Sequence, residues 1–160
     1  MVHFSIAALA VAAALVPLPA QAAKTEFISR SDVVEWIDRY RLKPEPARLP
    51  AAVKALSKAD ALRDPEAAGF YVGFAAGVLG ANPDKADELI AKMLPLPDGD
   101  QWLAVRAIAY SGLPQWRDLL RRYSTRMPAR KDMIERYLDG RLLTLDEIED
   151  RKSTRLNSSH

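Results

Sequence analysis

The stretch AAGFYVGFAAGVLGA, residues 67–81, decides the fold because it is uncharged and repeats a small residue at helical spacing. Gly69, Gly73 and Gly77 recur every four residues, so they share one face of a helix. Each glycine costs about 1 kcal/mol relative to alanine, which a close contact with a neighbouring helix can offset. A membrane-pairing face is the alternative, but this stretch gives only about 22 Å of helix against a bilayer core of about 30 Å. We therefore expect a buried central helix.

Prolines and glycines divide the rest of the chain into short helical segments. Proline is favoured at the first position of a helix, and glycine just after its end, where the left-handed conformation closes it. Between these marks apolar residues recur at helical spacing, and no segment alternates as a strand does. The sequence therefore predicts an all-α protein of about seven helices, with the start of an eighth at Thr144. The marking residues are Pro50, Pro65, Pro83, Pro114 and Pro128 at helix starts, and Gly80, Gly112 and Gly140 at helix ends.

Polar residues at three predicted helix starts have the chemistry of N-caps. Asp64 and Asn82 directly precede a proline, where a side-chain oxygen can accept from free backbone N–H groups. Thr144 is followed three residues later by Glu147, which is the spacing of a capping box. The predicted eighth helix therefore begins at Thr144 and continues into the terminal residues 150–160.

Helix pairs recur along the chain at a spacing typical of helical repeats. A helix that ends at Gly80 is followed 32 residues on by one that ends at Gly112. The second of these, DQWLAVRAIAYSG over residues 100–112, resembles the first helix of a HEAT-type repeat, with its Asp, Val-Arg pair, small apolar positions and closing Gly. A TPR-like or irregular helical array has similar features. We therefore expect short antiparallel helix hairpins, arranged either as an α-solenoid or as an irregular helical bundle.

The HEAT resemblance also concerns Arg106. In the HEAT pattern, the arginine at this place forms a ladder with an acidic residue of an adjacent repeat. The resemblance therefore implies a structural role for Arg106, and ligand binding is the alternative.

The first residues of the chain have the features of an export signal. Residues 6–18 are apolar, and Ala20-Gln21-Ala22 has the small-x-small form that signal peptidase accepts, although the residues before the apolar run include no Lys or Arg. About 13 apolar residues are too few to span a bilayer. We expect a signal peptide over residues 1–22, cleavage after Ala22, and a periplasmic or secreted protein.

The last residues, DRKSTRLNSSH at 150–160, have the features of a non-native tail. Read codon by codon, they translate a common sequencing-library adapter, and such scars are excluded from fold reasoning. We expect one native all-α domain over residues 23–149, with the natural gene continuing beyond Glu149.

Composition narrows the chemistry open to this domain. The chain has no cysteine, and its two histidines, His3 and His160, lie in the terminal segments. Zinc sites of His or Cys, triads, dithiols and disulfides are therefore excluded from residues 23–149. The formal net charge of +2 comes from residues 150–160, so nothing favours nucleic-acid binding. We expect no catalytic residue, no cofactor, no metal and no transmembrane helix in the mature chain.

One basic stretch, from Arg117 to Lys131, holds six basic residues and a single acidic one. On a helical projection its arginines flank an apolar stripe on both sides and do not form one patch. They can be solvated residues whose aliphatic stems cover the core edge, or they can dock an anionic partner, including the acidic stretch 132–149 of this chain. Because Trp, Tyr and Arg are enriched at binding hot spots, we predict a partner-binding set on this stretch. Its members are Trp116, Arg122, Tyr123 and Arg126.

Two functions fit these features. The first is an exported, non-catalytic helical-repeat protein that binds another protein or a cell-envelope component. The second is a helical accessory domain of a cell-envelope enzyme, such as a glycan-cleaving enzyme that works with carboxylates alone, whose catalytic part lay downstream. No Asp or Glu stands in a context that singles it out as catalytic, so the sequence favours binding. The partner and the oligomeric state stay open.

Overall fold

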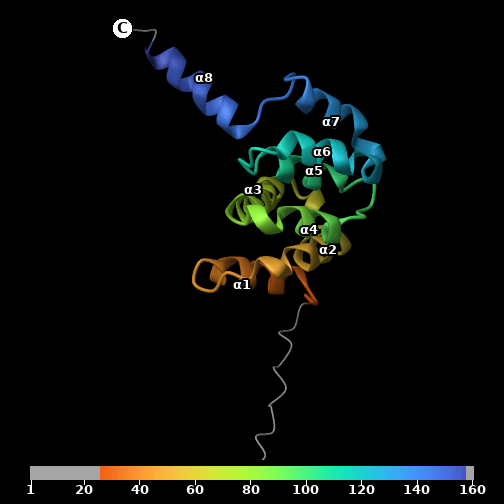
Figure 1. The fold of residues 1–160 in the computed structure, drawn as a ribbon. Coiled ribbons are helices and arrows are strands. Elements are labelled where there is room, and N and C mark those ends of the chain that lie inside the picture. Colours follow the sequence, from red (N-terminus) through yellow and green to blue (C-terminus); the bar gives the residue numbers. More distant parts are fainter. Residues whose placement is uncertain (1–25, 158–160) are drawn as a thin grey trace, which may run out of the picture.

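The computed structural model describes residues 26–157, with side chains up to residue 154, and the export-signal prediction lies outside them. The described residues form α-helices and short 3-10 turns without a strand, which confirms the all-α prediction (Figure 1). The α-helices are α1 (Arg30–Tyr40), α2 (Leu49–Lys58), α3 (Pro65–Ala81), α4 (Pro83–Met93), α5 (Gln101–Ala109), α6 (Trp116–Tyr123), α7 (Lys131–Leu138) and α8 (Leu145–Asn157). The 3-10 turns are η1 (Pro46–Arg48), η2 (Ala61–Arg63), η3 (Ser124–Arg126) and η4 (Pro128–Arg130).

Consecutive helices form hairpins that stack in two layers. In the first layer α3 packs against α1 and α5, and the Phe74 ring lies 5.2 Å from the ring centroids of both Trp36 and Tyr40. In the second layer α4 packs against α2 and is hydrogen-bonded to α6. Odd-numbered helices therefore contact odd-numbered ones and even-numbered helices contact even-numbered ones. Contacts within each hairpin join the two sets of helices, so the arrangement agrees with the predicted array of hairpins, as a solenoid-like fold or a helical bundle.

The most buried helix is α5, not the uncharged α3. Seven of the nine residues of α5 are buried, compared with six of the seventeen residues of α3. Ala104 and Ala107 of α5 are fully buried, and their small side chains let neighbouring helices approach closely. The central position therefore belongs to a helix that carries a charge, Arg106, on its exposed face.

The glycine row of α3 faces open space, so the prediction that it forms a buried contact is wrong. A Cβ atom added at Gly69, Gly73 or Gly77 would meet nothing within 4 Å. The opposite face of α3 carries the larger apolar side chains, and burying these gains far more free energy than burying glycine. That face holds Tyr71, Val72, Ala75, Val78 and Leu79, all of which are buried.

The close backbone approach occurs at the end of α3 instead. A Cβ atom on Gly80 would lie 2.2 Å from the backbone oxygen of Ser111, just after α5. Gly80 is therefore required for this contact and does not form the predicted C-cap, because α3 continues to Ala81. Gly112 and Gly140, in contrast, have φ of +68° and +77°, as the C-cap prediction requires.

The two predicted N-caps next to prolines have different outcomes. Asp64 caps α3 as expected, because its Oδ1 accepts from the backbone N–H of Glu66 at 3.1 Å. Asn82 makes no such bond to α4; its Nδ2 donates to the carbonyl of Val78 at 2.8 Å. Asn82 therefore satisfies a carbonyl in the last turn of the preceding helix.

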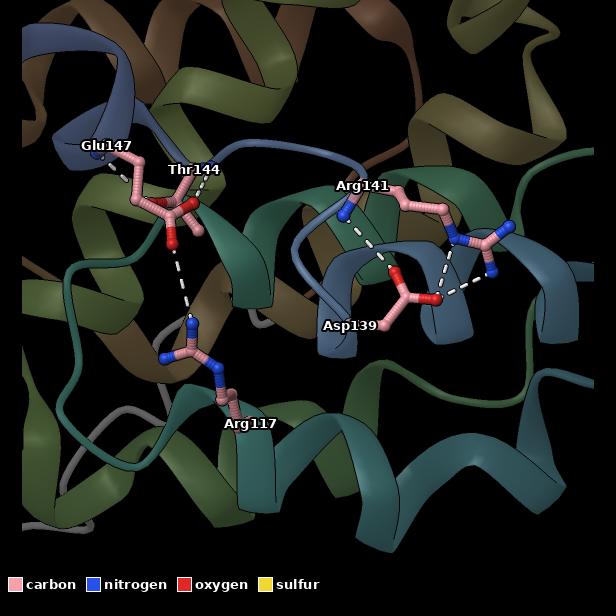
Figure 2. A network of polar contacts seen from close by, with 5 residues as sticks. All are labelled: Arg117, Asp139, Arg141, Thr144 and Glu147. Carbon is pink, nitrogen blue, oxygen red and sulfur yellow. Dashed lines mark hydrogen bonds and ion pairs between the residues drawn. The ribbon is translucent and has the colours of Figure 1, made fainter. Parts of the chain in front are cut away.

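The predicted capping box holds the start of α8 (Figure 2). The Thr144 N–H donates to Glu147 Oε2 at 2.7 Å, and the Glu147 N–H donates to Thr144 Oγ1 at 3.4 Å. Glu147 Oε1 also lies 3.4 Å from Arg117 Nη2, which ties this helix start to α6. Beyond this point α8 extends away from the other helices (Figure 1), and residues 149–154 are exposed.

Candidate binding site

A groove of about 690 Å³ lies beside α1. Residues 26–28, α1 and the connection to α2 form its walls. Phe27 and Trp36 lie at 5.4 Å between ring centroids, and Trp36 is buried. Ile28 and Leu42 also line the groove, yet they are 92% and 84% exposed. The groove therefore combines an aromatic surface with two aliphatic side chains that have almost no cover.

A cation stacks on the aromatic part of this groove. The Arg48 guanidinium carbon lies 4.3 Å from the Phe27 ring centroid and 5.8 Å from that of Trp36. Two N–H groups here, Trp36 Nε1 and Arg48 Nε, are buried and have no acceptor among the described residues. Because an unpaired buried donor costs about 1–3 kcal/mol, an acceptor supplied by a ligand would stabilise this region.

Charged side chains around the groove largely neutralise one another. Asp32 Oδ2 accepts from the backbone N–H groups of Ile28 and Ser29, each at 3.0 Å, and so fixes the chain before α1. The remaining pairs are local ones at the rim, within α1 or within the connection that follows it. They are Arg39–Glu35 at 2.6 Å, Lys43–Glu45 at 3.6 Å and Arg48–Glu45 at 3.5 Å. The rim therefore presents no strong charge of one sign.

The predicted partner-binding residues lie together at the junction of α4 and α6. Trp116 and Tyr123 are buried, and the guanidinium carbon of Arg117 lies 4.3 Å from the Trp116 ring centroid. Arg122 Nη1 donates to Asp87 Oδ1 of α4 at 2.7 Å. Arg126 Nη2 donates to the backbone oxygen of Leu94 at 2.8 Å. Arg122, Tyr123 and Arg126 therefore fasten α6 and the turn after it to α4 and to the segment that follows α4. Trp116 is buried at the start of α6, and the binding of a partner by these four residues stays a prediction.

Tyr123 and Asp87 form the centre of that junction. The Tyr123 hydroxyl lies 3.0 Å from both the backbone oxygen and Oδ1 of Asp87 and can donate to either. Burial raises the pKa of Tyr123, and the neighbouring Asp87 carboxylate raises it further. Arg122 thus pairs with Asp87, which lies outside the acidic stretch 132–149 considered from the sequence. Within that stretch, Glu147 pairs with Arg117 and Glu135 pairs with Lys131.

The start of α5 contains the most buried polar side chains of the described domain. Ser57 Oγ donates to Asp100 Oδ2 at 2.5 Å and joins α2 to α5. Gln101 donates to the Leu96 oxygen at 3.3 Å and accepts from the Ala129 N–H at 3.2 Å. These bonds hold the loop before α5 and the turn before α7, so we assign Asp100 and Gln101 a structural role.

Sequence reasoning missed the groove beside α1. The signal was weak but present: Phe27 and Ile28 form an apolar pair before a polar helix start, and Leu42 is the single apolar residue in RYRLKPEP. Helical periodicity does not place Phe27, Ile28 or Leu42, because all three lie outside a helix.

No protein-family model, curated protein or solved structure matches this chain. Among the helices that the structure describes, none combines the length and apolar character needed to cross a membrane. In the same part of the chain, no three or more acidic, histidine or cysteine side chains gather as they do around a metal ion.

Proposed function

We propose that this chain is an exported, non-catalytic helical protein that binds a protein partner, and that the groove beside α1 receives an apolar segment of that partner. The export signal and the HEAT-like hairpins support this proposal from the sequence. One structural observation carries it: Ile28 and Leu42 are 92% and 84% exposed on the rim of one groove.

Burial of these side chains supplies the driving force for binding. Covering one aliphatic side chain contributes about 1.5–3 kcal/mol, and two such side chains lie beside an aromatic surface. Because the rim charges are paired with one another, the groove favours an apolar segment over a highly charged one. The volume of about 690 Å³ is in the range of pockets that bury several side chains.

Trp36 adds a directional contact to this apolar recognition. Its Nε1–H is a buried donor without an acceptor, and the ring lines the groove. A backbone carbonyl of an extended partner segment is an acceptor of suitable size. The proposed ligand is therefore a peptide segment with one or two large apolar side chains.

The junction of α4 and α6 is the second proposed contact surface. The Arg122 side chain is 59% exposed although it pairs with Asp87, so it can still contact a partner. Its internal bonds mean that a partner must compete with Asp87 for the same guanidinium. We therefore assign this surface the smaller share of the binding energy.

The experiment uses a photo-crosslinking residue at position 28 in the full chain, expressed in a Gram-negative host. The crosslinked protein is identified by mass spectrometry, purified, and titrated against the unmodified chain. Ile28→Asp and Leu42→Asp should each weaken binding by at least about tenfold, which corresponds to about 1.4 kcal/mol. Leu145→Asp is the matched control, because Leu145 is a 45% exposed leucine on α8 and should leave binding unchanged.

Several results decide between this proposal and its competitors. Binding that survives Ile28→Asp and Leu42→Asp but is lost on charge reversal of Arg122 and Arg126 would move the site to α6. Glycan hydrolysis by the purified chain, lost on changing a single Glu, would overturn the non-catalytic assignment. N-terminal sequencing tests export separately: a mature chain that begins at Ala23 supports it, and intact Met1 in the cytoplasm contradicts it.

A further inference from the structure

A second, smaller cleft lies between α5, η4 and α7. It has a volume of about 230 Å³ and is lined by Trp102, Arg106, Arg130 and Met133. Trp102 and Arg106 are one turn apart on α5, and the Arg106 guanidinium carbon lies 5.6 Å from the Trp102 ring centroid. Arg130 ends η4, and Met133 lies in the first turn of α7. The cleft therefore combines two guanidinium groups with an indole and a thioether side chain.

Neither arginine has a carboxylate partner among the described residues. No carboxylate oxygen there lies within 4.0 Å of the nitrogens of Arg106 or Arg130, so the ladder implied by the HEAT resemblance does not form in this part of the chain. Most arginines of the described domain are paired in this way. The paired ones are Arg30, Arg39, Arg48, Arg63, Arg117, Arg121, Arg122 and Arg141.

Neutral groups hold the two cations in place. Arg130 Nη2 donates to the backbone oxygen of Gly99 at 3.1 Å, while its Nε is buried and has no acceptor. Arg106 lies beside Tyr137 and acts to lower the pKa of that hydroxyl, against larger raising effects of burial and Tyr110. Two positive groups that line one small cleft repel each other, and an anion between them replaces that repulsion by attraction.

We propose that this cleft binds a carboxylate carried on an apolar or aromatic group. A carboxylate can accept two parallel N–H bonds from the planar guanidinium fork, which is the strong form of this contact. Trp102 and Met133 give the cleft an apolar surface that fits the remainder of such a ligand. Inorganic phosphate satisfies the charges but leaves this surface unused, so the cleft favours the carboxylate. The site is distinct from the groove beside α1, and this proposal stands independently of it.

The test is an NMR titration of the full chain with benzoate, and with inorganic phosphate at equal ionic strength. We expect saturable shifts of the Trp102 indole N–H and the Arg106 and Arg130 Nε–H signals, with a benzoate Kd of about 1 mM. Phosphate should bind at least about tenfold more weakly. Arg106→Gln and Arg130→Gln should each weaken benzoate binding by at least about tenfold. Arg136→Gln is the matched control, since Arg136 is exposed on α7 outside this cleft.

The outcomes separate the possible sources of binding. Equal loss in Arg136→Gln would show general attraction of anions to the surface and would overturn the site. Phosphate binding as tight as benzoate would overturn the carboxylate assignment. Because Arg130→Gln also removes the bond to Gly99, Arg106→Lys is a second variant that keeps the charge but removes the fork. Unchanged benzoate binding in Arg106→Lys and Arg106→Gln would remove Arg106 from the site and contradict the proposal.

Discussion

The two ends of one face of α3 contrast most clearly at their glycines. Over most of this face, Gly69, Gly73 and Gly77 have nothing within 4 Å of where a Cβ atom would lie. At its C-terminal end, Gly80 faces the backbone oxygen of Ser111, and an added Cβ atom would lie only 2.2 Å from it. The same residue type is therefore dispensable at three positions and required at the fourth.

This difference shows what a glycine pattern can and cannot indicate. A glycine row at helical spacing marks one face of a helix, but the larger apolar residues determine which face is buried. Gly80 lies on the same face three residues after Gly77, and its role follows from the position of the turn after α5. Close approach of two backbones is a tertiary property that local spacing does not encode.

The largest expected effect is at the packed end of α3. Gly80→Ala should lower the free energy of unfolding by about 1–3 kcal/mol, because the new methyl group meets a backbone oxygen that cannot rotate away. Ser111 is held by its own hydrogen bonds to the Ile108 oxygen, at 3.3 Å from N and 2.7 Å from Oγ. Urea denaturation measures the change, with Gly77→Ala as the control one turn earlier. Equal stability of the two variants would mean that the close approach does not exist.

The contact between α7 and the end of α5, next to Ser111, should weaken at high pH. Burial, followed by the hydrogen bond with Tyr110, raises the pKa of Tyr137, whose hydroxyl donates to that of Tyr110 at 3.1 Å. Below pH 10 the Tyr137 hydroxyl is protonated in both the folded and the unfolded protein. Above pH 10 this hydroxyl loses its proton in the unfolded chain first, because its pKa is higher in the folded protein. Stability should therefore fall by about 1 kcal/mol per pH unit above pH 10.

Denaturation curves between pH 9 and 11 measure this effect, and Tyr137→Phe is the control. The variant should lose part of the pH slope while keeping the ring that packs against Tyr110. Tyr40 and Tyr123 also have pKa values raised mainly by burial, so a smaller slope should persist. An identical slope in Tyr137→Phe would contradict the assignment to this residue.

The sequence predicted the helices but not most of the contacts between their side chains. Periodicity and prolines placed the helices, and the capping box of Thr144 and Glu147 formed as its spacing indicated. Asn82 has the right chemistry for an N-cap, yet its Nδ2 donates to the carbonyl of Val78, four residues earlier. An Asn side chain between two helices can reach backbone groups of either one, so its type alone does not decide which helix it bonds. The concavities were not predictable, since they join residues from separate elements and include connections without periodicity.

A smaller effect is expected on the open face of α3. Gly73→Ala should raise the free energy of unfolding by about 0.5–1 kcal/mol, because alanine restricts the unfolded chain and meets no neighbour. Gly73→Leu, which a buried contact would penalise, should also be tolerated. Thermal melts of both variants measure the change. A loss of more than about 1 kcal/mol would restore the buried-face interpretation.

The smallest effect is expected at the C-terminal part of α8. Deletion of residues 150–160 should leave the melting temperature unchanged within error, because α8 extends away from the other helices and residues 150–154 are exposed (Figure 1). The contacts that hold α8 lie at its start, where Glu147 bonds the Thr144 N–H and reaches Arg117 (Figure 2). Thr144→Ala in the full chain is the matched comparison: it removes a cap worth about 1 kcal/mol and should speed amide exchange in α8. A deletion that costs more than about 1 kcal/mol would show that residues 150–160 stabilise the native fold, which is inconsistent with a tail of adapter origin.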